Sequence, residues 1–125
     1  MKTYTNAEKK KYFSDLRDRW NKSKKLAQED KEAEAMWREA GGKVSYTSFY
    51  FTLAQMRTLG LEGTPYVDCK TYNGWKDSGF IVKKGESSKI SGVTWISTKK
   101  DDEEEDGYKF PKSYHLFHKS QVQTL

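Results

Sequence analysis

The chain has 125 residues, of which 33% are charged and only 34% are hydrophobic. Its mean hydropathy of −1.01 would suit a disordered chain, but 4 Trp, 8 Tyr and 6 Phe predict a small aromatic core. One cysteine cannot form an internal disulfide, which fits a reducing cytoplasm. No signal peptide precedes the first helix, and no stretch approaches the ~20 apolar residues that span a membrane. We therefore expect one cytoplasmic domain over residues 1–125, without membrane association.

The charge is unevenly distributed along the chain. Six of the 18 acidic residues form a single run at 101–106, which mutual repulsion should keep in a solvated loop. Without that run, 23 basic residues stand against 12 acidic ones, a net charge of +11 rather than +5. A domain with this net charge attracts polyanions, of which nucleic acid is the commonest. The same composition also fits a basic, solvated surface that binds no ligand.

The first part of the chain is predicted to be helical over residues 6–40. Thr5 and Glu8 have the spacing of a capping box, and apolar residues then recur at helical intervals until Gly41. The pattern weakens around residues 22–24, so the segment is interpreted as one long helix or two shorter ones. Its aromatic stripe is more typical of a core than of a ligand site.

A further helix is predicted over residues 45–59. Phe49 and Met56 would lie on one face, and Gly60 provides a left-handed exit. Arg57 lies near the C-terminus of this helix, where a cation complements the helix dipole. Arg57 is therefore open to a structural interpretation as well as to a role in binding phosphate.

From residue 65 onward, short strands replace the helical pattern. Four segments are predicted as strands, at 65–69, 80–84, 89–97 and 113–123. Residues 70–78 have room for about two helical turns between the first two strands. The predicted fold class is α+β: N-terminal helices followed by a small, mostly antiparallel sheet with one short inserted helix.

Residues suited to catalysis or metal binding are few and poorly spaced. His115 and His118 lie three apart on a predicted strand and would point to opposite faces. Gly85 is followed by Glu86, whereas a phosphate loop needs Gly-Lys-Ser/Thr. Cys69 is expected to be a small buried residue. We therefore expect no metal, no cofactor and no enzymatic activity, and a small hydrolase built on a Cys or Ser with a distant His is the weakest alternative.

Cations and aromatic rings alternate closely between residues 70 and 95. Unpaired bases stack on exposed rings, and lysines in the same groove bind the backbone phosphates. Because neither contact reads base edges, such a surface binds single strands of any sequence. Trp75 is assigned to the core. The predicted nucleic-acid contacts are Lys70, Lys76, Lys83, Lys84, Lys89 and Arg57 on phosphates, and Tyr72 and Trp95 on bases.

Residues 72–86, with the sequence YNGWKDSGFIVKKGE, resemble the signature of the ArdC-like single-stranded-DNA-binding domain of antirestriction proteins. In that family a helix carrying Trp leads to Gly and then to Val-x-Lys-Gly-Glu. Residues 44–48 with Gln55 resemble the family's Tyr-Ser segment, which opens a helix that ends near a Gln. Residues 114–121 resemble its closing strand, so that the likeness covers residues 44–123.

The resemblance implies a stand-alone module that binds single-stranded DNA, of the kind found on phages and mobile elements and acting in the host cytoplasm. The same chemistry extends to RNA. Val44 and Ser48 stand where family members usually have Tyr and Asn, so no polar role is carried over to them. The family's C-terminal metalloprotease-like domain has no counterpart in the match, and its peptidase activity is not carried over.

A second hypothesis concerns the acidic run at 101–106. Closely spaced carboxylates imitate the phosphates of DNA, so the chain could instead be a phage-type anti-defence inhibitor that binds a host defence protein through this run.

Overall fold

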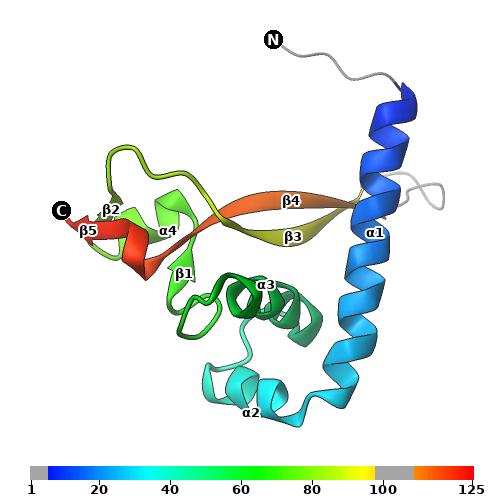
Figure 1. Ribbon diagram of the computed structural model, residues 1–125, viewed down its shortest axis with the longest axis horizontal. Helices are drawn as coiled ribbons and strands as arrows, with labels where there is room; N and C mark the ends of the chain where they lie inside the picture. The colour runs from blue at the N-terminus through cyan, green and yellow to red at the C-terminus, as the bar shows by residue number, and fades with distance from the viewer. Residues whose placement is uncertain (1–5, 98–108) are drawn as a thin grey trace, which may run out of the picture.

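The computed structural model describes residues 6–97 and 109–125. Its N-terminal half consists of the helices α1 (Asn6–Glu29), α2 (Lys31–Glu39) and α3 (Tyr46–Leu59), as Figure 1 shows. The acidic run at 101–106, and the DNA mimicry suggested for it, lie outside the described residues. No helix within the described ranges is both long and apolar enough to cross a membrane.

The predicted helical segment is two helices, and the break falls at Asp30 rather than around residues 22–24. Asp30 has extended backbone, with φ −100° and ψ 90°, and its carboxylate accepts a hydrogen bond from the Ala33 N–H at 3.0 Å. An aspartate that caps a new helix in this way satisfies an otherwise unpaired donor. The hydroxyl of Tyr46 lies 2.7 Å from the carbonyl of Ala27 and 2.9 Å from that of Asp30, where α1 ends.

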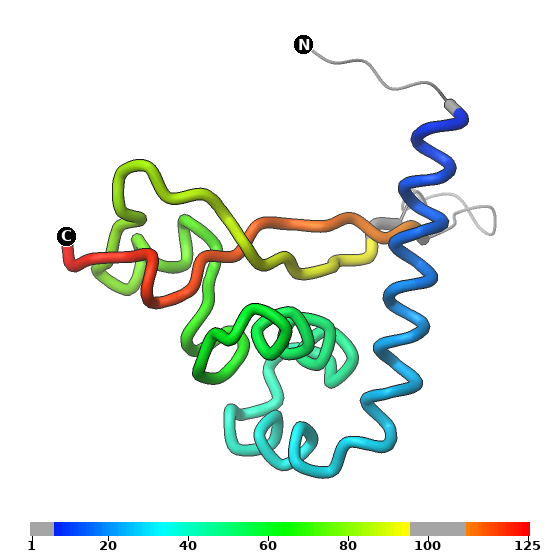
Figure 2. Tube along the Cα trace, viewed as in Figure 1, coloured from blue at the N-terminus to red at the C-terminus, as the bar shows by residue number. Residues whose placement is uncertain are grey.

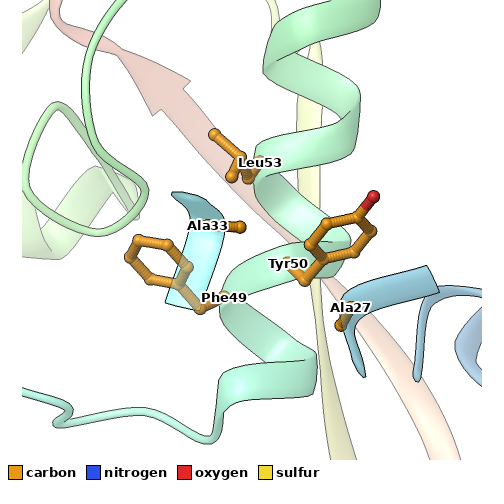
Figure 3. Packing of buried hydrophobic residues seen from close by; sticks show 5 residues of the cluster. All are labelled: Ala27, Ala33, Phe49, Tyr50 and Leu53. Atoms are coloured by element: carbon orange, nitrogen blue, oxygen red, sulfur yellow. The ribbon is translucent and has the colours of Figure 1, made fainter. Parts of the chain in front are cut away.

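Helix α3 confirms the prediction for residues 45–59. Ser45 caps it, accepting from the Ser48 N–H at 3.2 Å, and Gly60 ends it with φ 70°. Figure 3 shows the buried cluster that joins the three helices, with Phe49, Tyr50 and Leu53 of α3 packed against alanines of α1 and α2. Small residues on α1 and α2 allow this close approach.

In the rest of the described chain, residues 60–97 and 109–125, two small antiparallel sheets accompany one short α-helix, which confirms the α+β class. The larger sheet has the order β1 (Cys69–Lys70), β4 (Lys109–His118), β3 (Ile90–Ser97). The smaller one pairs β2 (Phe80–Val82) with β5 (Val122–Thr124). Between β1 and β2 lies the inserted helix α4 (Tyr72–Asp77). The C-terminus lies at the end of the sheets away from α1 (Figure 2).

Two predicted strands differ from the structure. Only Cys69 of the segment 65–69 belongs to a strand, because residues 65–68 form a turn in which the Asp68 N–H donates to the Thr64 carbonyl at 2.8 Å. The segment 113–123 is divided by a 3₁₀ turn (Lys119–Gln121), which His118 caps through its ring nitrogen. In both places local hydrogen bonds outweigh a strand-like alternation of residues.

The two faces of the larger sheet are covered differently. Ile90 pairs with Leu116 on one face, where both are buried against Met56 of α3. The other face carries Ser91 opposite His115, because side chains alternate along a strand. At one end of that face, Val93 packs on α1. At the other end of the sheet, α4 contacts both β1 and β4. Between these two ends, His115 is exposed. Figure 1 shows α1 and α4 at opposite ends of the β3–β4 hairpin.

Candidate nucleic-acid interface

A groove of about 620 Å³ lies beside α4 on the open face of the larger sheet, and we call it the α4–β4 groove. The start of α4 forms one wall, residues 87 and 88 form the other, and β4 forms the floor. Its lining consists of Thr71, Tyr72, Asn73, Ser87, Ser88, Tyr114, His115 and Phe117. Tyr72 is 47% exposed and His115 is also exposed, so that two rings lie open to solvent in one groove.

Helix α4 is held against the sheet by Trp75. The indole of Trp75 is buried and donates through Nε1 to the Phe117 carbonyl at 2.8 Å. Its ring also meets Phe80 edge to face, with 5.5 Å between the centroids. Thr71 caps the helix by accepting from the Gly74 N–H at 3.0 Å. The anchored helix therefore presents Tyr72, in its first turn, at a defined place, and Trp75 belongs to the core as predicted.

The opposite wall is fixed by two polar side chains. The amide of Gln121 donates to the Ser87 carbonyl at 2.6 Å and accepts from the His118 N–H at 3.0 Å. Ser88 Oγ lies 2.8 Å from the carbonyl of Ile90 and 2.7 Å from that of Leu116. Because Gln121 is buried and fully engaged, this wall is tied to the core rather than to solvent.

Five of the predicted contacts lie on the segments that build these walls. Lys70 Nζ stands 5.0 Å from the centroid of the Trp75 ring and 3.0 Å from Ser78 Oγ, beside α4. Lys76 is exposed on α4 itself, as is Tyr72. Lys83 and Lys84 begin the loop 83–89, which contains Ser87 and Ser88. The ammonium of Lys83 lies 3.3 Å from the Ser120 carbonyl, and the side chain of Lys84 is exposed. Of the eight predicted contacts, only Tyr72 lines the groove itself.

The other three predicted contacts lie elsewhere. Arg57 donates to Asp30 at 2.8 Å, and this hydrogen bond raises the pKa of Arg57 and lowers that of Asp30, which makes Arg57 part of the helix packing. Trp95 stands edge to face with Trp20 of α1, with 5.7 Å between the ring centroids. It lies roughly 17 Å along β3 from Ile90. Lys89 lines a second groove, between α1 and α3.

Sequence reasoning missed His115 and Phe117 as members of the groove. The spacing of His115 and His118 is poor for metal ligands or for a catalytic pair, and the sequence analysis assigned neither histidine to the nucleic-acid surface. The available signal was the alternation of β4, which puts His115 and Phe117 on the same face, two residues apart. His118 lies on the other face, where Nε2 is 2.6 Å from the Glu62 carbonyl and Nδ1 is 2.9 Å from Ser120 Oγ.

Cys69 is buried as expected. Burial raises the pKa of its thiol to about 11, and the Tyr66 N–H donates to Sγ at 3.4 Å. A thiol with that pKa is protonated at neutral pH and is a poor nucleophile.

Within residues 6–97 and 109–125, no three His, Cys, Asp or Glu side chains lie close enough together to hold a metal ion. Comparison with protein-family models, with curated proteins and with solved structures returned no match.

Proposed function

We propose that the chain is a non-enzymatic, ArdC-like domain that binds single-stranded DNA of any sequence in the α4–β4 groove. The observation that carries the proposal is the exposed ring of Tyr72, which shares a groove with His115 between two lysine-bearing segments. None of the described residues that line the groove is acidic. The lining therefore offers faces on which bases stack and contains no carboxylate. The lysines, together with Asp77 and Glu86, lie on the adjoining segments.

The chemistry of the groove favours single strands over duplexes. A base can stack on Tyr72 only when it is free of its own pairing partner, and each such stack stabilises a complex by about 1–3 kcal/mol. The hydroxyls of Thr71 and Ser87 line the groove as hydrogen-bond donors suited to phosphate and sugar oxygens, whereas the Ser88 hydroxyl already donates to backbone carbonyls. Lys70, Lys76 and Lys84 would add long-range attraction. RNA offers similar base faces and the same phosphates, so the proposal extends to RNA.

The resemblance of residues 72–86 to the ArdC-like signature supports a role on phages or mobile elements, in DNA maintenance or antirestriction within the host cytoplasm. The second candidate is the anti-defence inhibitor, favoured by the six consecutive acids at 101–106. Deleting 101–106 separates the two: loss of binding to a host protein with unchanged oligonucleotide affinity supports DNA mimicry.

The direct test is fluorescence anisotropy with a labelled oligothymidylate of about 20 nucleotides, a length that covers one typical site. Affinity should fall steeply between 50 and 200 mM salt, as counterion release requires. Tyr72→Ala should weaken binding by about tenfold, which corresponds to the loss of one stacked base. Tyr12→Ala is the matched control, because Tyr12 is also 47% exposed but lies on α1. Salt-independent affinity, or equal losses in both variants, would contradict the proposal.

A further inference from the structure

A second groove, of about 460 Å³, runs between α1 and α3, and we call it the α1–α3 groove. It ends at the start of β3. Its lining consists of Arg19, Lys22, Ser23, Leu26, Tyr50, Phe51, Ala54, Gln55, Thr58, Leu59 and Lys89. The proposed nucleic-acid site uses none of these residues, although Lys89 was among the contacts predicted from the sequence.

The apolar surface of this groove is aliphatic. Leu26 of α1 is 44% exposed and Leu59 of α3 is 49% exposed, which is unusual for leucines that line one depression. The aromatic side chains in the groove are unsuited to stacking. Tyr50 and Phe51 are buried, and the guanidinium of Arg19 lies over the Phe51 ring at 4.9 Å from its centroid. A nucleic acid base would find no free ring here, whereas aliphatic side chains of a protein partner would find matching surface.

The charges around the groove all have one sign. Arg19 and Lys22 come from α1 and Lys89 from the loop just before β3, and no Asp or Glu is among the described residues that line it. Rim charges of one sign attract a partner of the opposite sign and exclude partners of the same sign. The partner must therefore combine acidic residues with leucine-like apolar residues.

We propose that the α1–α3 groove binds an acidic amphipathic helix of a partner protein. Two packed helices leave a groove along their line of contact in which a third helix can lie, with its apolar residues in the groove. Its leucines, at i, i+3, i+4 and i+7, would contact Leu26 and Leu59, and its acidic residues would face Arg19, Lys22 and Lys89. This site is separate from the α4–β4 groove and does not depend on DNA binding.

The test uses a fluorescein-labelled peptide of about 15 residues with leucines at helical spacing and Glu and Ala at the other positions. Binding to the full chain is followed by anisotropy. A peptide of the same composition with its leucines scattered, and one with Lys in place of Glu, should each bind at least tenfold more weakly. Binding of all three peptides with equal affinity would overturn the proposal.

Single substitutions locate the site. Lys22→Glu and Leu26→Gln should each weaken peptide binding by about five- to tenfold. The first reverses a charge at the rim, and the second replaces an exposed leucine that the bound peptide would cover. Lys24→Glu is the matched charge control, since Lys24 is exposed on the same helix but does not line the groove. Leu125→Gln is the matched apolar control, because Leu125 is exposed at the other end of the molecule. An unchanged midpoint of thermal unfolding in each variant would show that its fold is intact.

Three further results would overturn the proposal. They are no peptide binding, equal losses in the variants and their controls, or displacement of the peptide by oligothymidylate together with an equal loss of oligothymidylate affinity in Lys22→Glu. The last result would assign the groove to nucleic acid. Failure of the Tyr72→Ala test would leave these outcomes unchanged, because Tyr72 does not line this groove.

Discussion

The α4–β4 groove and the α1–α3 groove differ in both their charges and their apolar surfaces. Arg19, Lys22 and Lys89 line the α1–α3 groove, whereas the lysines proposed for the α4–β4 groove lie on adjoining segments rather than in its lining. The α4–β4 groove exposes the rings of Tyr72 and His115 above a strand, and the α1–α3 groove exposes Leu26 and Leu59 between two helices. Positive charge attracts any polyanion to both. The shape of the apolar groups then selects the partner, because flat rings suit unpaired bases and aliphatic side chains suit another protein.

The two grooves are connected through the edge of β3. The amide of Gln55, which lines the α1–α3 groove, accepts from the Ser91 N–H at 2.9 Å and donates to the Ser91 carbonyl at 2.8 Å. These bonds satisfy backbone groups that an edge strand would leave unpaired. Ser91 lies directly opposite His115, which belongs to the floor of the α4–β4 groove. A change in β3 should therefore affect both grooves, whereas a change in either wall should affect only one.

Gly92→Ala has the largest expected effect, because it alters the strand that the grooves share. The added methyl group would collide with the ring of Tyr114, whose hydroxyl is held 2.6 Å from that of Tyr66. We expect the free energy of unfolding to fall by about 1–3 kcal/mol in urea denaturation, and both binding affinities to fall in parallel. Thr94→Ala, at an exposed position of the same strand, should change stability by less than ~0.5 kcal/mol. Loss of binding in one groove alone would contradict the connection through β3.

Removing single lysines sharpens the description of the α4–β4 groove. Lys76→Gln and Lys84→Gln should each weaken oligothymidylate binding a few-fold and make the slope of log affinity against log salt shallower by about 0.7. Neither substitution should change the affinity for the acidic peptide. Lys43→Gln, exposed between α2 and α3, is the control for lost charge. An unchanged salt slope would remove these lysines from the interface.

The smallest expected effect concerns the ion pair between Asp30 and Arg57, which lies outside the α4–β4 groove. Because the hydrogen bond from Arg57 lowers the pKa of Asp30 below its ordinary 3.8, the stabilisation is complete above about pH 5 and is lost as the pH falls through that lowered pKa. Asp30→Asn keeps a residue that can cap α2 but removes the charge, so stability should depend less on pH between about 5 and 3.

The measurement is the thermal midpoint across that pH range. Asp18→Asn, at an exposed position of α1, should behave like the unaltered protein. Oligothymidylate binding at neutral pH should not change in Asp30→Asn. A clear gain would place Arg57, freed from its carboxylate partner, in the nucleic-acid interface after all.

Local patterns in the sequence were sufficient for the fold class, for α3 with its Ser45 and Gly60 ends, and for the place of α4. Each of these depends on hydrogen bonds between residues that are close in the chain. Trp75 could be assigned to the core because a large ring in a short helix needs a partner surface. Asp30 is a residue type that favours the N-cap, so the sequence also contained a signal for the break there. The weaker helical pattern around residues 22–24 indicated an earlier position.

Only the tertiary structure decided how the eight predicted contacts divide between different surfaces. Arg57 meets Asp30 across 27 positions of the chain, and Trp95 meets Trp20 across a much longer separation. His115 shares a groove with Tyr72 because β4 returns beside β1, and Leu26 shares a groove with Leu59 because α1 packs on α3. Composition and spacing determine which groups are available and which local structures form. Which of those groups share a groove depends on long-range packing, which no pattern within a single segment encodes.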